Sequence, residues 1–341
     1  MKLAKKISVI LALGLAALAL MSYTQRAGPA SGPMVPAGGP DLGGKIAYAS
    51  AGSIWVYAGG KQRQLTAGPK DRQDKRDAQP SFSPDGTEII YTRFDEGFSD
   101  LYKLTVSGPS EPVALTRNRP QAETGAAGYA QEALWAMQPA WSPSGDRIAY
   151  TSDVRTEYPG LFSMDTNGDA VRKLDHLDHS QQAVEHPSWS PDGEKIAVAN
   201  YLTRNGKGQI WSLDTAMGRW TELTDAQDGA YDPAWSPDGQ WIAFTMRSGT
   251  AHNVYVVPTD AQKWTTQYPT PVQLTTDGAS RAPAWSPNGS YLAYLSLKDG
   301  SFDIYASVFQ LDANENPSLP DVKKLTDKAN ADANSGLSWA K

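Results

Sequence analysis

One seven-residue motif recurs five times along this chain, and it limits the folds that the chain can adopt. The motif consists of proline, a small residue, an aromatic residue, Ser-Pro, a polar residue and glycine. Its copies begin at Pro80, Pro139, Pro187, Pro233 and Pro283. A repeat of about 50 residues indicates a solenoid, a propeller or a tandem array, in which each unit packs on its neighbours.

Each part of the motif has a physical reason. The aromatic residue lies in a short strand, and Ser-Pro-Asp-Gly then forms a tight turn. Proline fixes φ at the first corner, aspartate tolerates the second, and glycine accepts a positive φ. A second strand follows, in which large residues alternate with alanine, as in Ile148–Tyr150, Ile242–Phe244 and Leu292–Tyr294. Alternation places alanine on one face of the strand, so a neighbouring sheet can come close.

Two further patterns complete each repeat. A third strand reads aliphatic, aromatic, any residue, aliphatic, as in Leu101–Leu104, Ile210–Leu213 and Val254–Val257. A fourth strand ends in Leu-Thr, at Leu65, Leu115, Leu223, Leu274 and Leu325, with Leu174-Asp175 as a variant. Four short strands per unit predict an all-β propeller with four-stranded antiparallel blades.

The two patterns differ in number, and the difference predicts how the ring closes. The fourth-strand ending occurs six times, whereas the turn motif occurs five times. The first unit begins at its second strand, Lys45–Tyr48, and the chain ends with an isolated first strand, Ser335–Trp339. We therefore expect a six-bladed β-propeller in which the C-terminal strand completes the first blade, because closure protects both sheet edges.

These motifs resemble those of the TolB-like propellers, which are similar to the propeller domains of prolyl oligopeptidases and dipeptidyl peptidases. The resemblance covers residues 44–341, and it implies the fold without selecting one function. TolB carries an additional α/β domain, and the peptidases carry a hydrolase domain. We expect neither here, since a short linker precedes the repeats and the chain contains no Gly-x-Ser-x-Gly nucleophile motif.

The residues before the repeats predict export. Lysines precede an apolar run, Ile7–Met21, which is typical of a signal peptide. We expect residues 1–23 to be a signal peptide or an uncleaved N-terminal membrane anchor, because the cleavage pattern is poor. Residues 24–43 are rich in Gly, Pro and Ala and are expected to form a linker. The propeller then occupies residues 44–341.

Composition excludes several classes of protein. The chain has no cysteine, so disulfides, cysteine-bound metals and thiol nucleophiles are absent. A formal net charge of −6 without a basic stripe argues against nucleic acid as a partner. We expect a monomer without a cofactor, periplasmic or extracellular, whose partner is an envelope or extracellular protein, a peptide or a glycan.

Propeller geometry predicts which loops could bind that partner. Connections between blades, and between second and third strands, lie on one face around the mouth of the central channel. Arginine and tyrosine are favoured at interfaces. The candidate binding residues on this face are Arg93, Tyr158, Tyr201, Arg247, Arg281 and Asp232. The alternative for each of them is an ordinary solvated loop residue.

Two other segments have more than one interpretation. His176, His179 and His186 lie near carboxylates in one inter-blade loop and are secondary candidates for a metal site, although a polar surface loop is the favoured reading. The long connection at residues 117–138 has apolar residues at helical spacing, Ala130 to Met137. We expect a short helix there, which either packs over the channel mouth as part of the core or serves as a lid or a partner-docking element.

Two functions are compatible with the sequence. The first is a non-catalytic exported binding or scaffold protein of the cell envelope, which recognises its partner at the channel mouth. The alternative is a propeller enzyme, a metal-assisted lyase or a hydrolase acting on an extracellular polymer. A chain-long propeller without a catalytic motif favours binding. Catalytic pairs cannot be placed from the sequence, because loops of different blades meet only in the fold.

Overall fold

The computed structural model describes the strand β1 (Val35–Pro36) and, with short gaps, the chain from residue 42 to its end. The described ranges are 42–67, 75–108, 110–122, 124–126, 128–154, 156–177, 182–202, 206–264 and 266–341. The signal peptide expected at residues 1–23 lies outside them. Within these ranges no helix has the length and apolar character that crossing a membrane requires.

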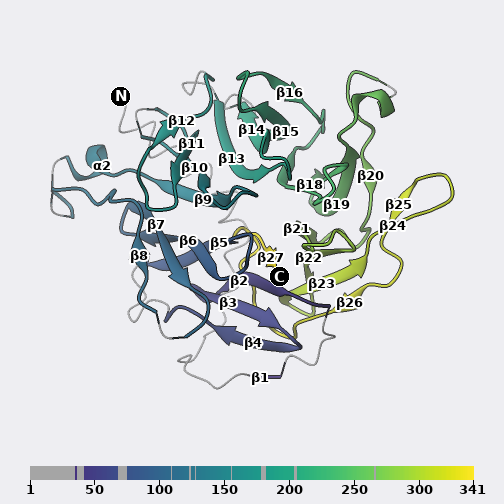
Figure 1. Cartoon of the computed structure of the whole chain (residues 1–341), viewed down its shortest axis with the longest axis horizontal. Helices are drawn as coiled ribbons and strands as arrows, with labels where there is room; N and C mark the ends of the chain where they lie inside the picture. The colour runs from purple at the N-terminus through teal and green to yellow at the C-terminus, as the bar shows by residue number, and fades with distance from the viewer. Residues whose placement is uncertain are drawn as a thin grey trace.

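Six antiparallel blades of four strands surround one axis, as Figure 1 shows. Blade 1 contains β2 (Lys45–Ser50), β3 (Ser53–Ala58), β4 (Lys61–Gln64) and β27 (Ser338–Ala340). Blade 2 contains β5 (Arg76–Phe82), β6 (Glu88–Asp95), β7 (Phe98–Thr105) and β8 (Val113–Ala114). Blade 3 contains β9 (Ala136–Trp141), β10 (Arg147–Ser152), β11 (Gly160–Asp165) and β12 (Arg172–Lys173). The first strand of each blade lies nearest the axis, a place that β27 takes in blade 1, and the fourth strand lies toward the rim (Figure 1).

The other three blades repeat this order. Blade 4 contains β13 (Gln182–Trp189), β14 (Lys195–Leu202), β15 (Lys207–Asp214) and β16 (Trp220–Glu222). Blade 5 contains β17 (Ala230–Trp235), β18 (Trp241–Ser248), β19 (Ala251–Pro258) and β20 (Val272–Gln273). Blade 6 contains β21 (Ser280–Trp285), β22 (Tyr291–Lys298), β23 (Ser301–Val308) and β26 (Lys323–Lys324). The predicted six-bladed propeller with four-stranded antiparallel blades is therefore confirmed.

The C-terminal strand completes blade 1, as the repeat count predicts. Strand β27 pairs with β2 in antiparallel register, with Ala340 opposite Lys45. The Lys45 Nζ donates hydrogen bonds to the backbone oxygens of Lys341, at 2.9 Å, and of Gly86 in blade 2, at 3.2 Å. One side chain thus joins the last residue to two blades, and the ring is closed by the two ends of the folded region.

Blade 1 also gains a strand that the sequence did not indicate. Strand β1 pairs with the outer strand β4, with Val35 opposite Gln62. These two residues fall within the stretch expected to be a linker, residues 24–43. Part of that stretch therefore covers an edge that would otherwise expose unpaired backbone groups.

The core consists of apolar layers between neighbouring blades. Ala197 and Ala199 of β14 are fully buried, and they lie in one cluster with Ile242 and Phe244 of β18 in the next blade. The alanine positions therefore face the neighbouring sheet, as the alternation in the sequence predicts. Their small size is what lets bulky side chains of the next blade fill the interface.

The turn motif also connects neighbouring blades. Gly239 has a φ of 72°, and a Cβ placed on it would lie 3.2 Å from the Cγ of Pro191 in the preceding blade. The backbone conformation and the close approach both favour glycine at this position. The Ser236 hydroxyl accepts the Trp241 amide at 2.9 Å and donates to Asp238 at 2.5 Å, so the turn is tied to the start of the next strand.

The helix expected near residues 130–137 is mostly wrong. Helix α2 (Tyr129–Glu132) is a single turn, and the backbone is already extended at Ala133, with ψ of 125°. Residues from Ala136 onward form β9, the innermost strand of blade 3. The blade needs this strand, and that tertiary requirement overrides the local helical spacing. Elsewhere a 3₁₀ turn, η1 (Ala261–Lys263), and a hairpin of β24 (Gln310–Leu311) and β25 (Pro317–Ser318) extend blades 5 and 6.

Candidate functional site: a polar cluster around the propeller axis

The innermost strands carry one backbone irregularity at the same place. A residue with positive φ stands directly before the motif proline, and the strand register shifts there in blades 2 to 6. We call these residues, with Gly336 at the equivalent place before β27, the axial ring: Gln79, Gln138, His186, Asp232, Ala282 and Gly336. A bulge re-aims the side chain of the bulged residue. Because the blades share this conformation, its strain belongs to the fold.

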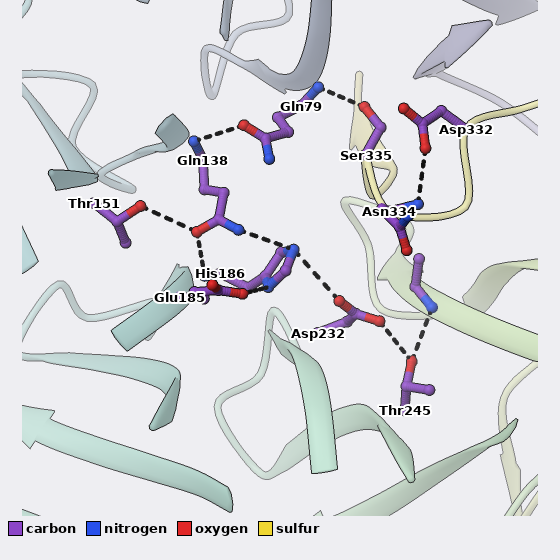
Figure 2. A network of polar contacts seen from close by, with 11 residues as sticks. Gln79, Gln138, Thr151, Glu185, His186, Asp232, Thr245, Asp332, Asn334 and Ser335 are labelled. Carbon is purple, nitrogen blue, oxygen red and sulfur yellow. Dashed lines mark hydrogen bonds and ion pairs between the residues drawn. The ribbon is translucent and has the colours of Figure 1, made fainter. Parts of the chain in front are cut away.

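Side chains of the axial ring join neighbouring blades. The Gln79 Oε1 accepts the backbone amide of Gln138 at 3.0 Å, and the Gln138 Oε1 accepts that of His186 at 3.0 Å (Figure 2). In blade 5 the task passes to Thr245, whose hydroxyl accepts the Ala282 amide at 3.0 Å and donates to Asp232 at 2.9 Å. Buried backbone amides at the bulges are satisfied in this way by the preceding blade.

Acidic groups gather beside His186. Its Nε2 lies 3.5 Å from the Asp232 Oδ1, and its Nδ1 lies 3.9 Å from the Glu185 Oε2 (Figure 2). Burial raises the pKa of the Glu185 carboxyl, whereas His186 and a hydrogen bond with Tyr201 act in the opposite direction. Burial and the nearby Glu185 and Asp232 raise the pKa of Tyr201 well above its ordinary value. Tyr201 is therefore a neutral hydroxyl in contact with a desolvated carboxyl group.

Basic groups lie on the side of blades 5 and 6. The Tyr231 ring lies 5.8 Å from that of Tyr201, and Tyr231 is hydrogen-bonded by Arg247. Burial lowers the pKa of the Arg281 guanidinium, and the charges of Asp232 and Asp332 only partly offset this effect. Arg281 therefore keeps its charge, since an arginine pKa starts far above neutrality, but it does so in a poorly solvated place.

The positive charges of Arg281 and Arg247 also affect His252. Burial lowers the pKa of its imidazole to about 4, and Arg281 and Arg247 add to this effect. At neutral pH His252 is therefore uncharged. We refer to the residues of both sides together as the axial cluster: Glu185, His186, Tyr201, Tyr231, Asp232, Arg247, His252 and Arg281.

The structure brings together four of the six candidate binding residues. Tyr201 comes from β14, Asp232 and Arg247 come from β17 and β18, and Arg281 comes from β21. They belong to blades 4, 5 and 6, and the contacts described above connect them around the axis. Whether they bind a partner remains a prediction.

The other two candidates lie elsewhere. The Arg93 guanidinium donates to both carboxylate oxygens of Asp77, at 2.7 and 2.9 Å, and its Cζ lies 4.5 Å from the centre of the Tyr102 ring. Its donors are thus engaged within blade 2. Tyr158 is half-buried in the connection between β10 and β11, and no contact found among the described residues links it to the axial cluster.

Tyr231 and Glu185 belong to the axial cluster but are not among the candidate binding residues that the sequence indicated. Both occupy the position two residues before the motif proline, where Arg281 stands in blade 6. The signal was available, because that position follows the same register in every copy of the motif. It was hard to use, since which face of a bulged strand a residue takes depends on the bulge itself.

The three histidines do not form one group in the structure. His176 is exposed beyond β12, near Gly218, His186 lies at the axis, and His179 falls outside the described residues. In the part of the chain that the structure describes, no three or more His, Asp or Glu side chains are grouped to hold a metal ion.

Comparisons with known proteins agree with the fold. The family model described as the TolB beta propeller domain, PD40, matches residues 126–270. The chain is similar to the crystal structure of TolB from Acinetobacter baumannii, with 19% identity and a TM-score of 0.62 over 89% of this chain and 68% of that one. It is also similar to a putative TolB from Agrobacterium tumefaciens, with 21% identity and a TM-score of 0.54 over 82% and 87%.

A third solved structure widens the comparison. A chain of a nidogen/laminin complex is similar at 12% identity with a TM-score of 0.60, over 88% of this chain and 99% of that one. No curated protein matches the sequence. At these identities the likeness shows the fold. The chain is a six-bladed β-propeller that is similar to TolB, and the resemblance inferred from its repeats is confirmed.

Proposed function

We propose that this chain is a non-catalytic exported binding protein of the cell envelope, which recognises a protein, a peptide or a glycan at the axial cluster. One observation carries the proposal. Side chains from three different blades converge at the axis, and they combine a tyrosine pair with charges of both signs. Tyrosine and arginine supply contact area and fixed donors at protein interfaces, so this composition suits recognition.

The solved structures that share this fold support the same proposal. TolB structures and a propeller from a nidogen/laminin complex share this fold, and the latter structure is by its name a complex between proteins. The fold alone does not determine function. The proposal therefore depends on the axial cluster of this chain and is tested there.

The test compares binding to peptide and glycan arrays for variants on the two faces. Tyr201→Phe removes one hydroxyl group, and Arg247→Ala removes an exposed guanidinium, so neither should unfold the protein. We expect each to weaken capture of a bound ligand by more than about 1 kcal/mol if it anchors the partner. The matched control is Trp264→Ala combined with Tyr268→Ala, in the connection between β19 and β20. If the control pair abolishes capture and the axial variants do not, the proposed face is wrong.

Export is part of the proposal and has its own test. Replacing Leu15 with arginine places a charge in the apolar run of the expected signal peptide, which should keep the protein in the cytoplasm. Cell fractionation measures this, and the mass of the exported chain distinguishes cleavage from retention as an anchor. Normal export of the Leu15→Arg variant would contradict the assignment.

One observation favours the enzyme as a second candidate. The Glu185 carboxyl is buried, its pKa is raised, and it lies beside Tyr201 and His186, an arrangement that can exchange protons. The test is turnover of polysaccharide and peptide substrates by the wild type and by Glu185→Gln. Turnover that the substitution abolishes would favour the enzyme over the binding protein.

A further inference from the structure

Arg281 is a partly buried cation that has no ion pair among the residues that the structure describes. Its Nε is buried without a hydrogen-bond partner, and none of its nitrogens lies in a salt bridge within the described ranges. The centre of the Phe302 ring lies 5.6 Å from its Cζ. Removing a guanidinium from water without pairing it costs several kcal/mol, which a fold tolerates where the charge has a use.

The nearby carboxylates do not satisfy this charge. Asp232 is engaged by the Thr245 hydroxyl at 2.9 Å and faces His186 at 3.5 Å. Asp332 accepts the backbone amide of Asn334 at 3.0 Å (Figure 2). Both act on Arg281 through their charge, but neither comes within ion-pair distance of it.

A second arginine lies on the same side of the axis as Arg281. Arg247 lies opposite His252 in the β18–β19 pair, and both Arg247 and Arg281 lower the pKa of that histidine. In the axial ring, the positions beside Arg281 are Ala282 and Gly336, which carry no hydrogen-bonding groups. At these two ring positions no side chain competes with a ligand for the Arg281 guanidinium.

We propose that Arg281, supported by Arg247, binds a carboxylate group presented by the partner, so the recognised segment is acidic at the point that reaches the axis. This inference rests on the proposed function. The planar guanidinium matches a carboxylate through two parallel hydrogen bonds, and such charge-assisted bonds are strong where water is excluded. The carboxylate can belong to an Asp or Glu side chain or to a chain terminus.

Arg93 provides a control within the same molecule. Its guanidinium already donates to both oxygens of Asp77 and stacks on Tyr102, so it has the bonds that Arg281 lacks. A carboxylate added in solution should therefore perturb Arg281 and leave Arg93 unchanged. General effects of ionic strength would perturb exposed arginines alike.

The experiment follows arginine Nε–H resonances by NMR during titration with glutarate, in the full-length chain. The resonance that disappears in Arg281→Lys identifies Arg281, and that of Arg93 is identified in the same way. We expect a saturable shift of the Arg281 resonance and a glutarate affinity that falls on the order of tenfold in Arg281→Lys. Absence of a shift at Arg281, or an equal shift at Arg93, would overturn the inference.

Capped peptides distinguish the sources of the carboxylate. One peptide carries a single glutamate between amidated and acetylated ends, a second carries a free C-terminus and no acidic side chain, and a third carries neither. Binding of the first or the second alone assigns the source, and binding of the third with equal affinity contradicts a carboxylate requirement. Chloride at matched ionic strength serves as the reference for each titration.

The inference and the proposed function can fail separately. If a partner is captured at the axial cluster and Arg281→Gln leaves its affinity unchanged, the carboxylate site is wrong and the binding function stands. If glutarate binds at Arg281 and the axial variants leave partner capture intact, the anion site stands and the proposed recognition face is wrong. Thermal unfolding of each variant checks that the fold is retained.

Discussion

The carboxylate of Asp175 accepts a hydrogen bond from the backbone amide of Leu161, which lies in β11, the third strand of blade 3. In the other five blades a threonine hydroxyl performs this task. The pairs are Thr66 with Ile54, Thr116 with Leu101, Thr224 with Ile210, Thr275 with Val254, and Thr326 with Ile304. The threonine of each Leu-Thr ending thus accepts the same hydrogen bond, and in blade 3 the Asp175 carboxylate accepts it instead.

Substitution of Asp175 tests this reading. Asp175→Ala leaves a buried amide without its acceptor and should lower the free energy of unfolding by about 1–3 kcal/mol. Asp175→Thr restores the acceptor used in the other blades and should stay within about 1 kcal/mol of the wild type. Urea unfolding measures both, with Thr224→Ala as the equivalent loss in blade 4. Equal destabilisation by Asp175→Thr and Asp175→Ala would show that another property of the aspartate matters.

The Arg93–Asp77 pair predicts a structural effect where the sequence suggested a binding residue. Asp77 is only 4% exposed, so Arg93→Ala leaves a nearly buried carboxylate unpaired. We expect a loss of about 1–3 kcal/mol in the free energy of unfolding, and an unchanged affinity for any ligand of the axial cluster. The control is Arg247→Ala, an exposed arginine of the next-but-two blade, which should cost under about 0.5 kcal/mol. Weakened binding by Arg93→Ala in a folded protein would restore Arg93 to the recognition face.

The repeats predicted the fold well because each feature that recurs from one copy to the next has a local physical cause. The residues Pro237 to Gly239 are those that a tight turn favours, and Ala243 lies between Ile242 and Phe244 because large and small residues alternate along the strand. Each copy of the motif repeats both patterns. The missing first strand of blade 1 was also predictable, since counting the copies revealed it. The single-turn helix α2 was not, because helical spacing near residue 133 competes with the demand for an innermost strand.

The candidate site was predictable only in part. Propeller geometry indicated the end of the blades where Arg247 and Arg281 lie, but the structure places both within strands, β18 and β21, and not in loops. Their neighbours were not predictable, since these depend on strand register and on the packing of adjacent blades. No local pattern shows that Arg93 is paired with Asp77 while Arg281 has no ion pair among the described residues. That distinction depends on strand register, which places Asp77 opposite Arg93, and on the packing around Arg281.

Ring closure predicts that the C-terminal segment is indispensable. Deletion of residues 333–341 removes β27, including the Ser338 hydroxyl that accepts the Phe82 amide at 2.9 Å and the buried Ala340. Blade 1 would then expose the edge of β2, so we expect loss of cooperative thermal unfolding and a tendency to aggregate. Calorimetry and light scattering measure the two effects. A truncated chain that unfolds like the intact protein would contradict closure as a source of stability.

A single substitution separates the contribution of the Lys45 side chain from that of the β2–β27 strand pairing. Lys45→Met removes the Nζ that bonds the backbone oxygens of Lys341 and Gly86, and it leaves the β2–β27 pairing in place. Because the lysine is partly solvated, we expect a loss of about 1 kcal/mol, far less than the deletion causes. If Lys45→Met lowers the free energy of unfolding as much as the deletion does, the side chain and not the strand pairing stabilises the closed ring.

His252 predicts how stability depends on pH. Its pKa in the folded protein is about 4, whereas an unfolded histidine has an ordinary value near 6.5. Below that ordinary value the unfolded state takes up a proton that the folded state refuses, so the stabilising contribution is complete above pH ~6.5 and is lost as pH falls toward ~4. Since the imidazole is partly exposed, we expect about 1–3 kcal/mol in all.

The variant His252→Asn isolates this contribution from the other titrating groups. Glu185, whose folded pKa is raised, acts in the opposite direction over part of the same range, but it is present in both proteins. The free energy of unfolding of His252→Asn should therefore fall less than that of the wild type between pH 6.5 and pH 4, by about 1–3 kcal/mol. Arg281→Gln should raise the pKa of His252 toward its ordinary value, as measured by NMR, because a neighbouring positive charge is removed. Parallel pH profiles for the wild type and His252→Asn would mean that the imidazole is solvated and that the positive charges of Arg247 and Arg281 are screened from it.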